Sequence, residues 1–313
     1  MKKPPGIVII GAGPFGRDFH YTTLDILRRK GEVKVLGVYD RDAKKAESAA
    51  LDFKIPKVYQ NFSEVLGESS ASGYAVLVPP KASHEVVLSL VPTGKPIFSE
   101  KPPGYTGKES RELSDKVRVP NVVAFNRRYM PQSLIFQKEL SKIKTIYFAE
   151  AHFYRHARTE ADFVRGTGIH GINLLEHFFG SLTLESVETW DNPDAVSKIR
   201  IARLRFRNDA RLLLKIFPAC GSTYERIEAH SPDTSLYFYG PNTTDTPGRI
   251  EVHEKGRIRL AHRGSAKQNR LETWGLVGEW RDFLQAIRTG KPTVSNFQNA
   301  WTGLALAEAI EQT

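Results

Sequence analysis

The sequence predicts an N-terminal α/β domain with a doubly wound parallel sheet, followed by an α+β domain with a mostly antiparallel, open sheet. Three observations predict this. A fully apolar run at residues 7–10 leads directly into Gly-x-Gly-x-x-Gly at residues 11–16. Short apolar runs then alternate with helical patterns as far as residue 125, and from residue 126 long strand-like stretches follow one another. We therefore predict two domains, residues 1–125 and 126–313.

The first domain has the β-α-β rhythm of a parallel sheet. Its strands read as continuous apolar runs because such strands are covered on both faces. The predicted strands are residues 7–10, 33–39, 57–59, 74–78, 96–99 and 121–125. The predicted helices are residues 14–30, 42–52, a turn from Ser63, 83–91 and 106–117.

The second domain begins with a different pattern, because polar and apolar residues alternate as in a half-buried strand. Its predicted strands are residues 145–154, 184–191, 196–207, 210–217, 224–230, 235–239, 249–254 and 257–262. Hairpin-like turns such as Arg207-Asn208-Asp209 separate them. Helices are expected at residues 169–179, 274–288 and 296–311. This arrangement predicts an antiparallel sheet with one face open to solvent or a partner.

The glycine loop is typical of a site for a dinucleotide pyrophosphate. Gly11 permits the tight turn after the strand, Gly13 lets phosphate approach the backbone, and Gly16 lets the helix pack closely on the sheet. Pro14 and Phe15 complete the loop at the start of that helix. The free N–H groups and the dipole of a helix N-terminus favour negative charge there.

Asp40 indicates which dinucleotide the loop takes. It ends the second predicted strand, where this fold places the acid that binds the adenosine ribose hydroxyls. A carboxylate repels a 2′-phosphate, so we predict NAD. NADP is the alternative, because Arg41, Lys44 and Lys45 follow and could hold that phosphate. An alternative interpretation of Asp40 is a helix N-cap.

Composition excludes several classes of protein. The chain carries a net charge of +10, but its basic residues are spread along the sequence, which favours a basic enzyme over a nucleic-acid binder. No apolar run approaches the roughly 18 residues of a membrane span, and no signal peptide is evident. The single cysteine, Cys220, excludes an internal disulfide and a cysteine metal cluster. We expect a cytoplasmic protein without a metal site.

Further segments make the chain resemble the Gfo/Idh/MocA family of NAD(P)-dependent oxidoreductases. Val-Pro-Pro-Lys-Ala-Ser-His at residues 78–84 resembles the family's strand-to-helix loop beside the cofactor. Gly-Lys-Pro-Ile-Phe-Ser-Glu-Lys-Pro at residues 94–102 is similar to its G-K-x-V-x-x-E-K-P signature. Residues 166–173 stand where the family has D-x-G-x-H-x-x-D, and the C-terminal pattern at residues 280–284 and 305–310 is similar as well. The resemblance covers nearly the whole chain.

The resemblance implies roles for the residues of the first domain. Pro79, His84, Glu100 and Lys101 would lie beside the cofactor. The family's matching lysine hydrogen-bonds the reacting oxygen and takes part in proton transfer, so Lys101 is the first catalytic candidate, with Glu100 to hold it in place. The peptide bond before Pro102 is often cis in the family. The resemblance also implies a homo-oligomer, a dimer or tetramer, formed through the open sheet of the second domain.

His170 is the second catalytic candidate that the resemblance implies, since the family's matching histidine contacts substrate hydroxyls and serves as an acid or base. The sequence departs from the family's polyol dehydrogenases at both flanking aspartates, which are Gly166 and Asn173 here. Asn173 can still hydrogen-bond substrate. The carboxylates that could substitute are Glu160, Asp162 and Glu176.

A cationic stretch before this motif favours an anionic substrate such as a sugar acid. Arg155 and Arg158 are the predicted contacts, because the guanidinium fork grips carboxylate or phosphate. Arg127 matches a family segment at the domain junction and is a further substrate-binding candidate. The alternative is an arginine-rich face exposed to solvent.

These observations predict an oxidoreductase that exchanges hydride between nicotinamide and a C–OH or C=O carbon of a sugar, sugar acid or related small molecule. Two alternatives stay open because both family carboxylates are missing: an imine or enone reductase of the same family, and a non-catalytic NAD(P)-binding regulator. Nucleic-acid binding ranks last.

Overall fold

Five parallel strands form the sheet that carries the glycine loop. They are β1 (Gly6–Ile10), β2 (Lys34–Tyr39), β3 (Gly73–Val76), β4 (Ile97–Ser99) and β5 (Asn121–Val123). Their order in the sheet is β2-β1-β3-β4-β5, which confirms the doubly wound parallel prediction. The predicted strand at residues 57–59 is reduced to one bridge between Val58 and Val38.

The computed structural model describes residues 3–193, 196–207, 209–241, 247–265 and 267–313. By packing, the chain forms two compact units: Met1–Asn126 with Leu276–Trp301, and Arg127–Gly275 with Thr302–Thr313. The functional domain boundary between residues 125 and 126 stays a prediction. Asn208, in the middle of a predicted turn, lies outside the described residues.

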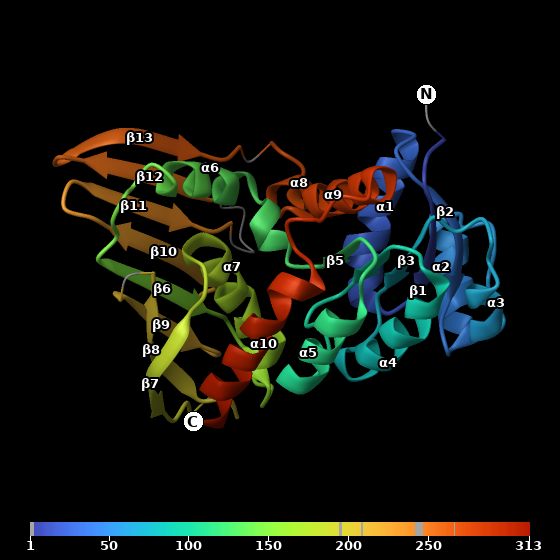
Figure 1. Ribbon diagram of the computed structural model, residues 1–313, viewed down its shortest axis with the longest axis horizontal. Helices are drawn as coiled ribbons and strands as arrows, with labels where there is room; N and C mark the ends of the chain where they lie inside the picture. Colours follow the sequence, from blue (N-terminus) through green and yellow to red (C-terminus); the bar gives the residue numbers. More distant parts are fainter. Residues whose placement is uncertain (1–2, 194–195, 208, 242–246, 266) are drawn as a thin grey trace. The chain divides into compact units, whose positions relative to one another are not determined.

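Helices cover both faces of the parallel sheet, and Figure 1 shows α1 and α9 on one side with α4 and α5 on the other. The helices of this unit are η1 (Gly16–Tyr21, π-helical), α1 (Thr22–Arg29), α2 (Ala43–Phe53), α3 (Phe62–Leu66), α4 (Pro80–Leu90), η2 (Val91–Thr93), α5 (Gly107–Lys116) and α9 (Leu276–Thr289). The prediction that α4 begins at Ser83 was wrong. It begins at Pro80, because proline suits a first helical turn, where no N–H is needed.

The segment from residue 276 returns to the first unit, and its aromatic side chains explain why. Trp280 of α9 is fully buried and stacks on Phe98 of β4, with ring centroids 4.0 Å apart and an interplanar angle of 6°. Phe283 packs edge-on against both rings. The helix predicted at residues 274–288 is confirmed as α9, and a short helix that was not predicted, α8 (Arg270–Thr273), precedes it. Gly275, whose φ is +83°, separates the two helices. Glycine adopts that left-handed conformation without steric cost.

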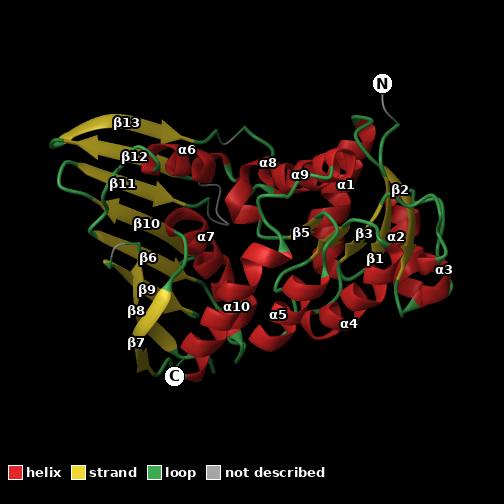
Figure 2. Ribbon diagram, viewed as in Figure 1, coloured by secondary structure: helices red, strands yellow, loops and turns green. Residues whose placement is uncertain are grey.

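Eight strands form the sheet of the second unit, in the order β13-β12-β11-β10-β6-β9-β8-β7 (Figure 2). All neighbours are antiparallel except β6 and β9, which pair in parallel. The strands are β6 (Phe148–Tyr154), β7 (Thr183–Trp190), β8 (Ile199–Phe206), β9 (Ala210–Phe217), β10 (Tyr224–His230), β11 (Thr234–Tyr239), β12 (Arg249–Glu254) and β13 (Arg257–Arg263). The predicted antiparallel, open sheet is confirmed.

One face of this sheet is covered and the other is open, as the alternation along β6 shows. Ala149, Ala151 and Phe153 are buried, whereas Glu150 and His152 between them are partly exposed. The remaining helical elements are η3 (Asn126–Tyr129), α6 (Pro131–Leu140), η4 (Val164–Gly168), α7 (Ile169–Phe179) and α10 (Phe297–Gln312). The helix predicted at residues 169–179 is confirmed as α7, but α6 was not predicted. No helix in the described ranges is long and apolar enough to span a membrane.

Candidate active site

The loop after β1 needs glycine at its first position. Gly11 has a φ of +103°, and a Cβ there would lie 2.3 Å from the backbone oxygen of Leu77. The hydroxyl of Tyr21 donates to the Gly11 carbonyl at 2.8 Å and so fixes the turn. Burial raises the pKa of this tyrosine, which keeps its hydroxyl a donor.

Gly13 leaves the space that a cofactor would need. A Cβ at Gly13 would meet no atom within 4 Å, so this stretch of backbone lies open. Pro14 and Phe15 follow at the start of the helix, and Phe15 is exposed. A Cβ at Gly16 would lie 3.5 Å from the Leu77 Cβ, an ordinary contact, so Gly16 packs against the sheet without a steric need for glycine.

Asp40 lies against the glycine loop. Its carboxylate accepts from the backbone N–H of Ala12 at 2.7 Å and of Asp42 at 2.9 Å. The alternative interpretation of Asp40 as a helix N-cap was wrong, because Asp42 caps α2 by accepting from the Lys44 N–H at 3.2 Å. Arg41 is exposed. The open backbone at Gly13 and the adjacent carboxylate together fit a dinucleotide whose ribose hydroxyls are free.

Glu100 and Lys101 follow β4 directly. One Glu100 oxygen accepts from the Lys101 backbone N–H at 2.8 Å, and the other lies 2.5 Å from Nε2 of His20. The Lys101–Pro102 peptide bond is cis, as the resemblance implied. Pro79 precedes α4, and His84 on that helix lies 3.0 Å from a carboxylate oxygen of Glu112.

Sequence reasoning missed three buried polar side chains behind Glu100. His20 from η1 is fully buried, and its Nδ1 accepts from the indole N–H of Trp280 at 3.0 Å. Glu279 is also fully buried, and its nearer oxygen lies 4.0 Å from the same Nδ1. Burial, and then the neighbouring Glu100 charge, raise the pKa of Glu279 well above its usual range. Contacts between residues some 260 positions apart in sequence give no signal that a single sequence reveals.

In the second unit, α7 carries His170, Asn173 and Glu176 at intervals of three residues, which places them along one side of the helix. Asn173 is fully buried, and its Oδ1 accepts from Nε of the buried Arg128 at 2.7 Å. Burial lowers the pKa of Arg128 to about 10. Burial also raises the pKa of Glu176 to about 7, so this carboxyl titrates near neutrality.

Two of the predicted substrate-binding arginines share one buried carboxylate. Arg127 donates to both oxygens of Glu225, at 2.9 and 2.7 Å, and Arg155 also donates to it. Burial alone would raise the pKa of Glu225, but the two guanidinium charges outweigh it and lower the pKa to about 2. Arg158 is exposed and pairs with Glu160.

The structure thus brings the predicted residues together in two groups. The glycine loop, Asp40, Glu100 and Lys101 belong to the first unit, whereas Arg127, Arg155, His170 and Asn173 belong to the second. Within the described ranges, no group of three or more His, Cys, Asp or Glu side chains could hold a metal.

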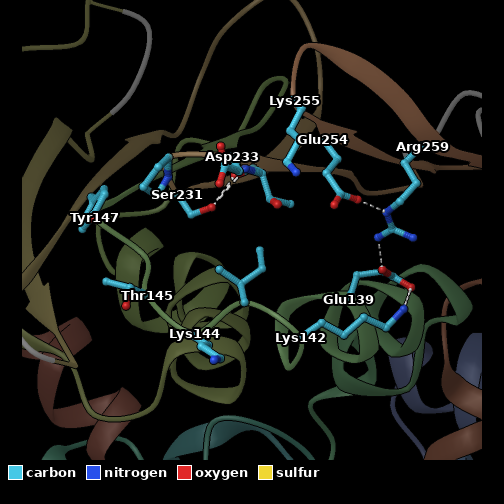
Figure 3. A pocket seen from close by; sticks show the side chains of 13 residues that line it. Glu139, Lys142, Lys144, Thr145, Tyr147, Ser231, Asp233, Glu254, Lys255 and Arg259 are labelled. Carbon is cyan, nitrogen blue, oxygen red and sulfur yellow. Dashed lines mark hydrogen bonds and ion pairs between the residues drawn. The ribbon is translucent and has the colours of Figure 1, made fainter.

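A separate hollow of about 700 Å³ in the second unit contains none of the predicted site residues. Figure 3 shows Arg259 between Glu254 and Glu139, with Lys142 beside Glu139. The Arg259–Glu254 ion pair measures 2.9 Å, and the Lys142–Glu139 ion pair 2.6 Å. The basic side chains Arg259 and Lys142 therefore already have carboxylate partners of the same unit.

Comparison with known proteins identifies the class of the first unit. Residues 6–126 match the family model GFO_IDH_MocA, described as an oxidoreductase family with an NAD-binding Rossmann fold. The glycine loop and Asp40 lie within this match. Residues 6–126 are therefore similar to the NAD-binding domain of the Gfo/Idh/MocA oxidoreductase family.

Curated relatives match part or nearly all of the chain. The uncharacterized protein YMR315W of Saccharomyces cerevisiae is 30% identical over 45% of this chain, which corresponds to only 41% of the yeast protein. Inositol 2-dehydrogenase 2 of Saccharopolyspora erythraea is 24% identical over 97% of this chain and 91% of its own length.

A solved structure shows the same fold over the full length. The levoglucosan dehydrogenase solved as a complex with NADH superposes with a TM-score of 0.85 at 16% identity, covering 99% of this chain and 96% of that chain. At this identity the likeness supports the fold of both units.

Proposed function

We propose that the protein is an NAD-dependent dehydrogenase or reductase that acts on a C–OH or C=O carbon of a sugar, sugar acid or related small molecule. The observation that carries the proposal is the placement of Glu100 and Lys101. β1 and β4 both pair in parallel with β3, so the glycine loop after β1 and Lys101 after β4 lie at the same edge of one sheet. Ligands of such sheets bind at that edge.

Lys101 handles the proton in this proposal. In the oxidation direction, the substrate O–H proton passes to the Lys101 amine, the C–O bond becomes a carbonyl, and the hydride leaves the same carbon. When bound, NAD supplies the hydride acceptor, and NADH the donor in reverse. Glu100 fixes the backbone at Lys101 through its 2.8 Å hydrogen bond. We carry His170 over from the family resemblance as the second acid or base.

The substrate class rests on two features. The relatives named inositol 2-dehydrogenase 2 and levoglucosan dehydrogenase suggest a polyhydroxylated carbon skeleton. Asn173 replaces a family carboxylate, and its fully buried side chain accepts from Arg128. Arg127 and Arg155 share the one carboxylate of Glu225, whereas Arg158 pairs with Glu160. The two arginines and Glu225 together keep a net positive charge, on which we base an anionic substituent.

A substitution at Lys101 tests the proposal. Lys101→Met removes the amine, so we expect kcat to fall by at least about a hundredfold while NADH still binds. The assay follows NADH absorbance with polyols, sugar acids, imines and enones. Lys108→Met, at an exposed lysine of α5, is the matched control and should behave as the wild type. Unchanged turnover in Lys101→Met would contradict the role of this lysine.

The same assay separates the alternatives. Gly166 and Asn173 in place of two family aspartates favour an imine or enone reductase, because such a reaction needs fewer carboxylates. If the protein turns over only imines or enones, it is a reductase of that kind. A protein that binds NADH, turns over nothing and is indifferent to Lys101→Met would instead be a regulator. Retention of the protein on DNA at physiological salt would indicate that it binds nucleic acid.

A further inference from the structure

A chain of hydrogen bonds runs from α9 to the proposed catalytic lysine. The Trp280 indole N–H donates to His20 Nδ1 at 3.0 Å, and His20 Nε2 lies 2.5 Å from a Glu100 oxygen. The other Glu100 oxygen accepts from the Lys101 backbone N–H at 2.8 Å. All four residues lie in the first unit, and His20 stands on the helix that follows the glycine loop.

The chain fixes the tautomer of His20. An indole nitrogen only donates, so His20 Nδ1 must be the acceptor and carry no proton. Nε2 therefore carries the proton and donates it to the Glu100 carboxylate. A neutral imidazole has one donor and one acceptor nitrogen, and both are used here.

The buried environment of Glu279 is consistent with this tautomer of His20. A fully buried Glu279 carboxylate would be costly beside Glu100, and burial raises its pKa well above the usual range. The alternative is that Glu279 gives its proton to His20. The carboxylate and the doubly protonated imidazole would then have the same total charge, zero, as the two neutral side chains. That imidazole would point an N–H at the Trp280 N–H, so the 3.0 Å contact favours the neutral pair.

We propose that His20 and Trp280 are positioning residues for Lys101, acting through Glu100. Trp280 selects the Nε2–H tautomer, His20 then orients the Glu100 carboxylate, and Glu100 holds the Lys101 backbone. The device also ties the helix of the glycine loop to the lysine, so cofactor site and proton-transfer group keep one geometry. This inference rests on the proposed function for the role of Lys101.

Trp280→Phe tests the device with little change in packing. The substitution removes the N–H but keeps an aromatic ring that can stack on Phe98. In the wild type, the ring centroids of Trp280 and Phe98 lie 4.0 Å apart. We expect kcat to fall about tenfold, as for a displaced catalytic group, with KM and the Kd for NADH within about twofold of wild type. Trp190→Phe, at an exposed tryptophan of β7, is the matched control. A Trp280→Phe enzyme with wild-type kcat would overturn the positioning role.

Long-range ¹H–¹⁵N spectra of the histidines test the tautomer without turnover. We expect His20 as the Nε2–H form in the wild type and in Glu279→Gln, and a mixture of tautomers in Trp280→Phe. The His20 signal is assigned by its loss in His20→Gln, or by its shift in Trp280→Phe if the first variant does not fold. A doubly protonated or Nδ1–H His20 in the wild type would overturn the inference. Absence of any turnover with the expected tautomer present would instead count against the proposed function.

Discussion

At the residue scale, the carboxyl groups inside the protein are of two kinds. One kind is ionised beside guanidinium groups, and the other has a pKa that burial raises. Glu225 is buried and ionised because two guanidinium groups hold its pKa at about 2. Glu279 is buried, and burial raises its pKa. Burial also raises the pKa of Glu176, an effect that Thr302 and Arg128 offset only in part. A buried charge without a partner is expensive. We therefore expect the two kinds of carboxyl to change the stability with pH in opposite directions.

Glu225→Gln should destabilise the protein by about 3–5 kcal/mol, because Arg127 and Arg155 would keep buried charges without a carboxylate. The folded pKa of about 2 lies below the ordinary 4.5. The carboxylate therefore stabilises the fold above about pH 4.5, and this contribution disappears as the pH falls toward 2. Urea unfolding of both proteins across this range measures the difference.

Glu160→Gln is the matched control for that measurement. Glu160 also pairs with an arginine, but its partner Arg158 is exposed, so we expect a loss of less than about 1 kcal/mol. Equal effects of the two substitutions would mean that the Glu225 cluster is no more than a surface ion pair.

Glu176→Gln should have the opposite sign. The folded pKa of about 7 lies above the ordinary 4.5, so the folded state binds the proton more tightly, and wild-type stability falls as pH rises through this window. The variant should be more stable than wild type at pH 8, by up to about 3 kcal/mol. Burial lowers the pKa of the neighbouring His177 to about 4. Its contribution to the pH dependence is common to both proteins, so it cancels in the difference between their free energies of unfolding. No pH dependence in that difference would contradict the buried, protonated Glu176.

Residue-level predictions from sequence succeeded where a motif fixes local geometry and failed where distant segments meet. The loop at Gly11 and the capping of the Lys101 N–H by Glu100 depend on neighbours in the chain. The contact between His20 and Trp280 joins residues far apart in sequence. The pairing of Arg127 and Arg155 with Glu225, from β10, is similarly long-range, so the sequence did not reveal that these arginines share a carboxylate partner.

At the element scale, periodicity predicted the strands and most helices because each buries a continuous apolar face. α7 was predicted from its apolar pattern and ends at Gly180, whose φ is +82°. α6 was missed because its apolar residues do not gather on one side, and Leu134 remains 58% exposed. The start of α4 differs from the prediction because Pro80 occupies the first helical turn, where no N–H is needed.

The glycine loop supplies the prediction that belongs to this scale. Gly11→Ala forces a left-handed φ and a clash with the Leu77 oxygen at 2.3 Å, so it should destabilise the first unit and abolish NADH binding. Gly13→Ala meets no atom within 4 Å, so it should unfold like the wild type yet bind NADH at least about tenfold more weakly, because the methyl group occupies the cofactor's path. Thermal unfolding and NADH titration measure the two effects.

A Gly13→Ala variant with full NADH affinity would show that the cofactor does not approach this backbone. A Gly11→Ala variant as stable as the wild type would show that the turn has another solution. The two glycines thus separate a folding requirement from a binding requirement within one loop.

At the scale of the whole molecule, the chain forms two units that are each completed by C-terminal segments. Leu276–Trp301 returns to the first unit and Thr302–Thr313 to the second. This return was not evident from sequence, because α9 is amphipathic and its apolar side gives no indication of which unit it covers. The open face of the second sheet remains our proposed surface for a dimer or tetramer, which light scattering of the purified protein would test.

We propose that the first unit binds a nicotinamide dinucleotide and prefers NAD. The most direct measurement is a fluorescence titration of the folded protein with NADH and, separately, NADPH. We predict micromolar binding of NADH and weaker binding of NADPH, because Asp40 at the glycine loop repels a 2′-phosphate. Tighter binding of NADPH would show that Arg41, Lys44 and Lys45 decide the preference. If the folded protein binds neither dinucleotide, the proposed cofactor site in the first unit is wrong.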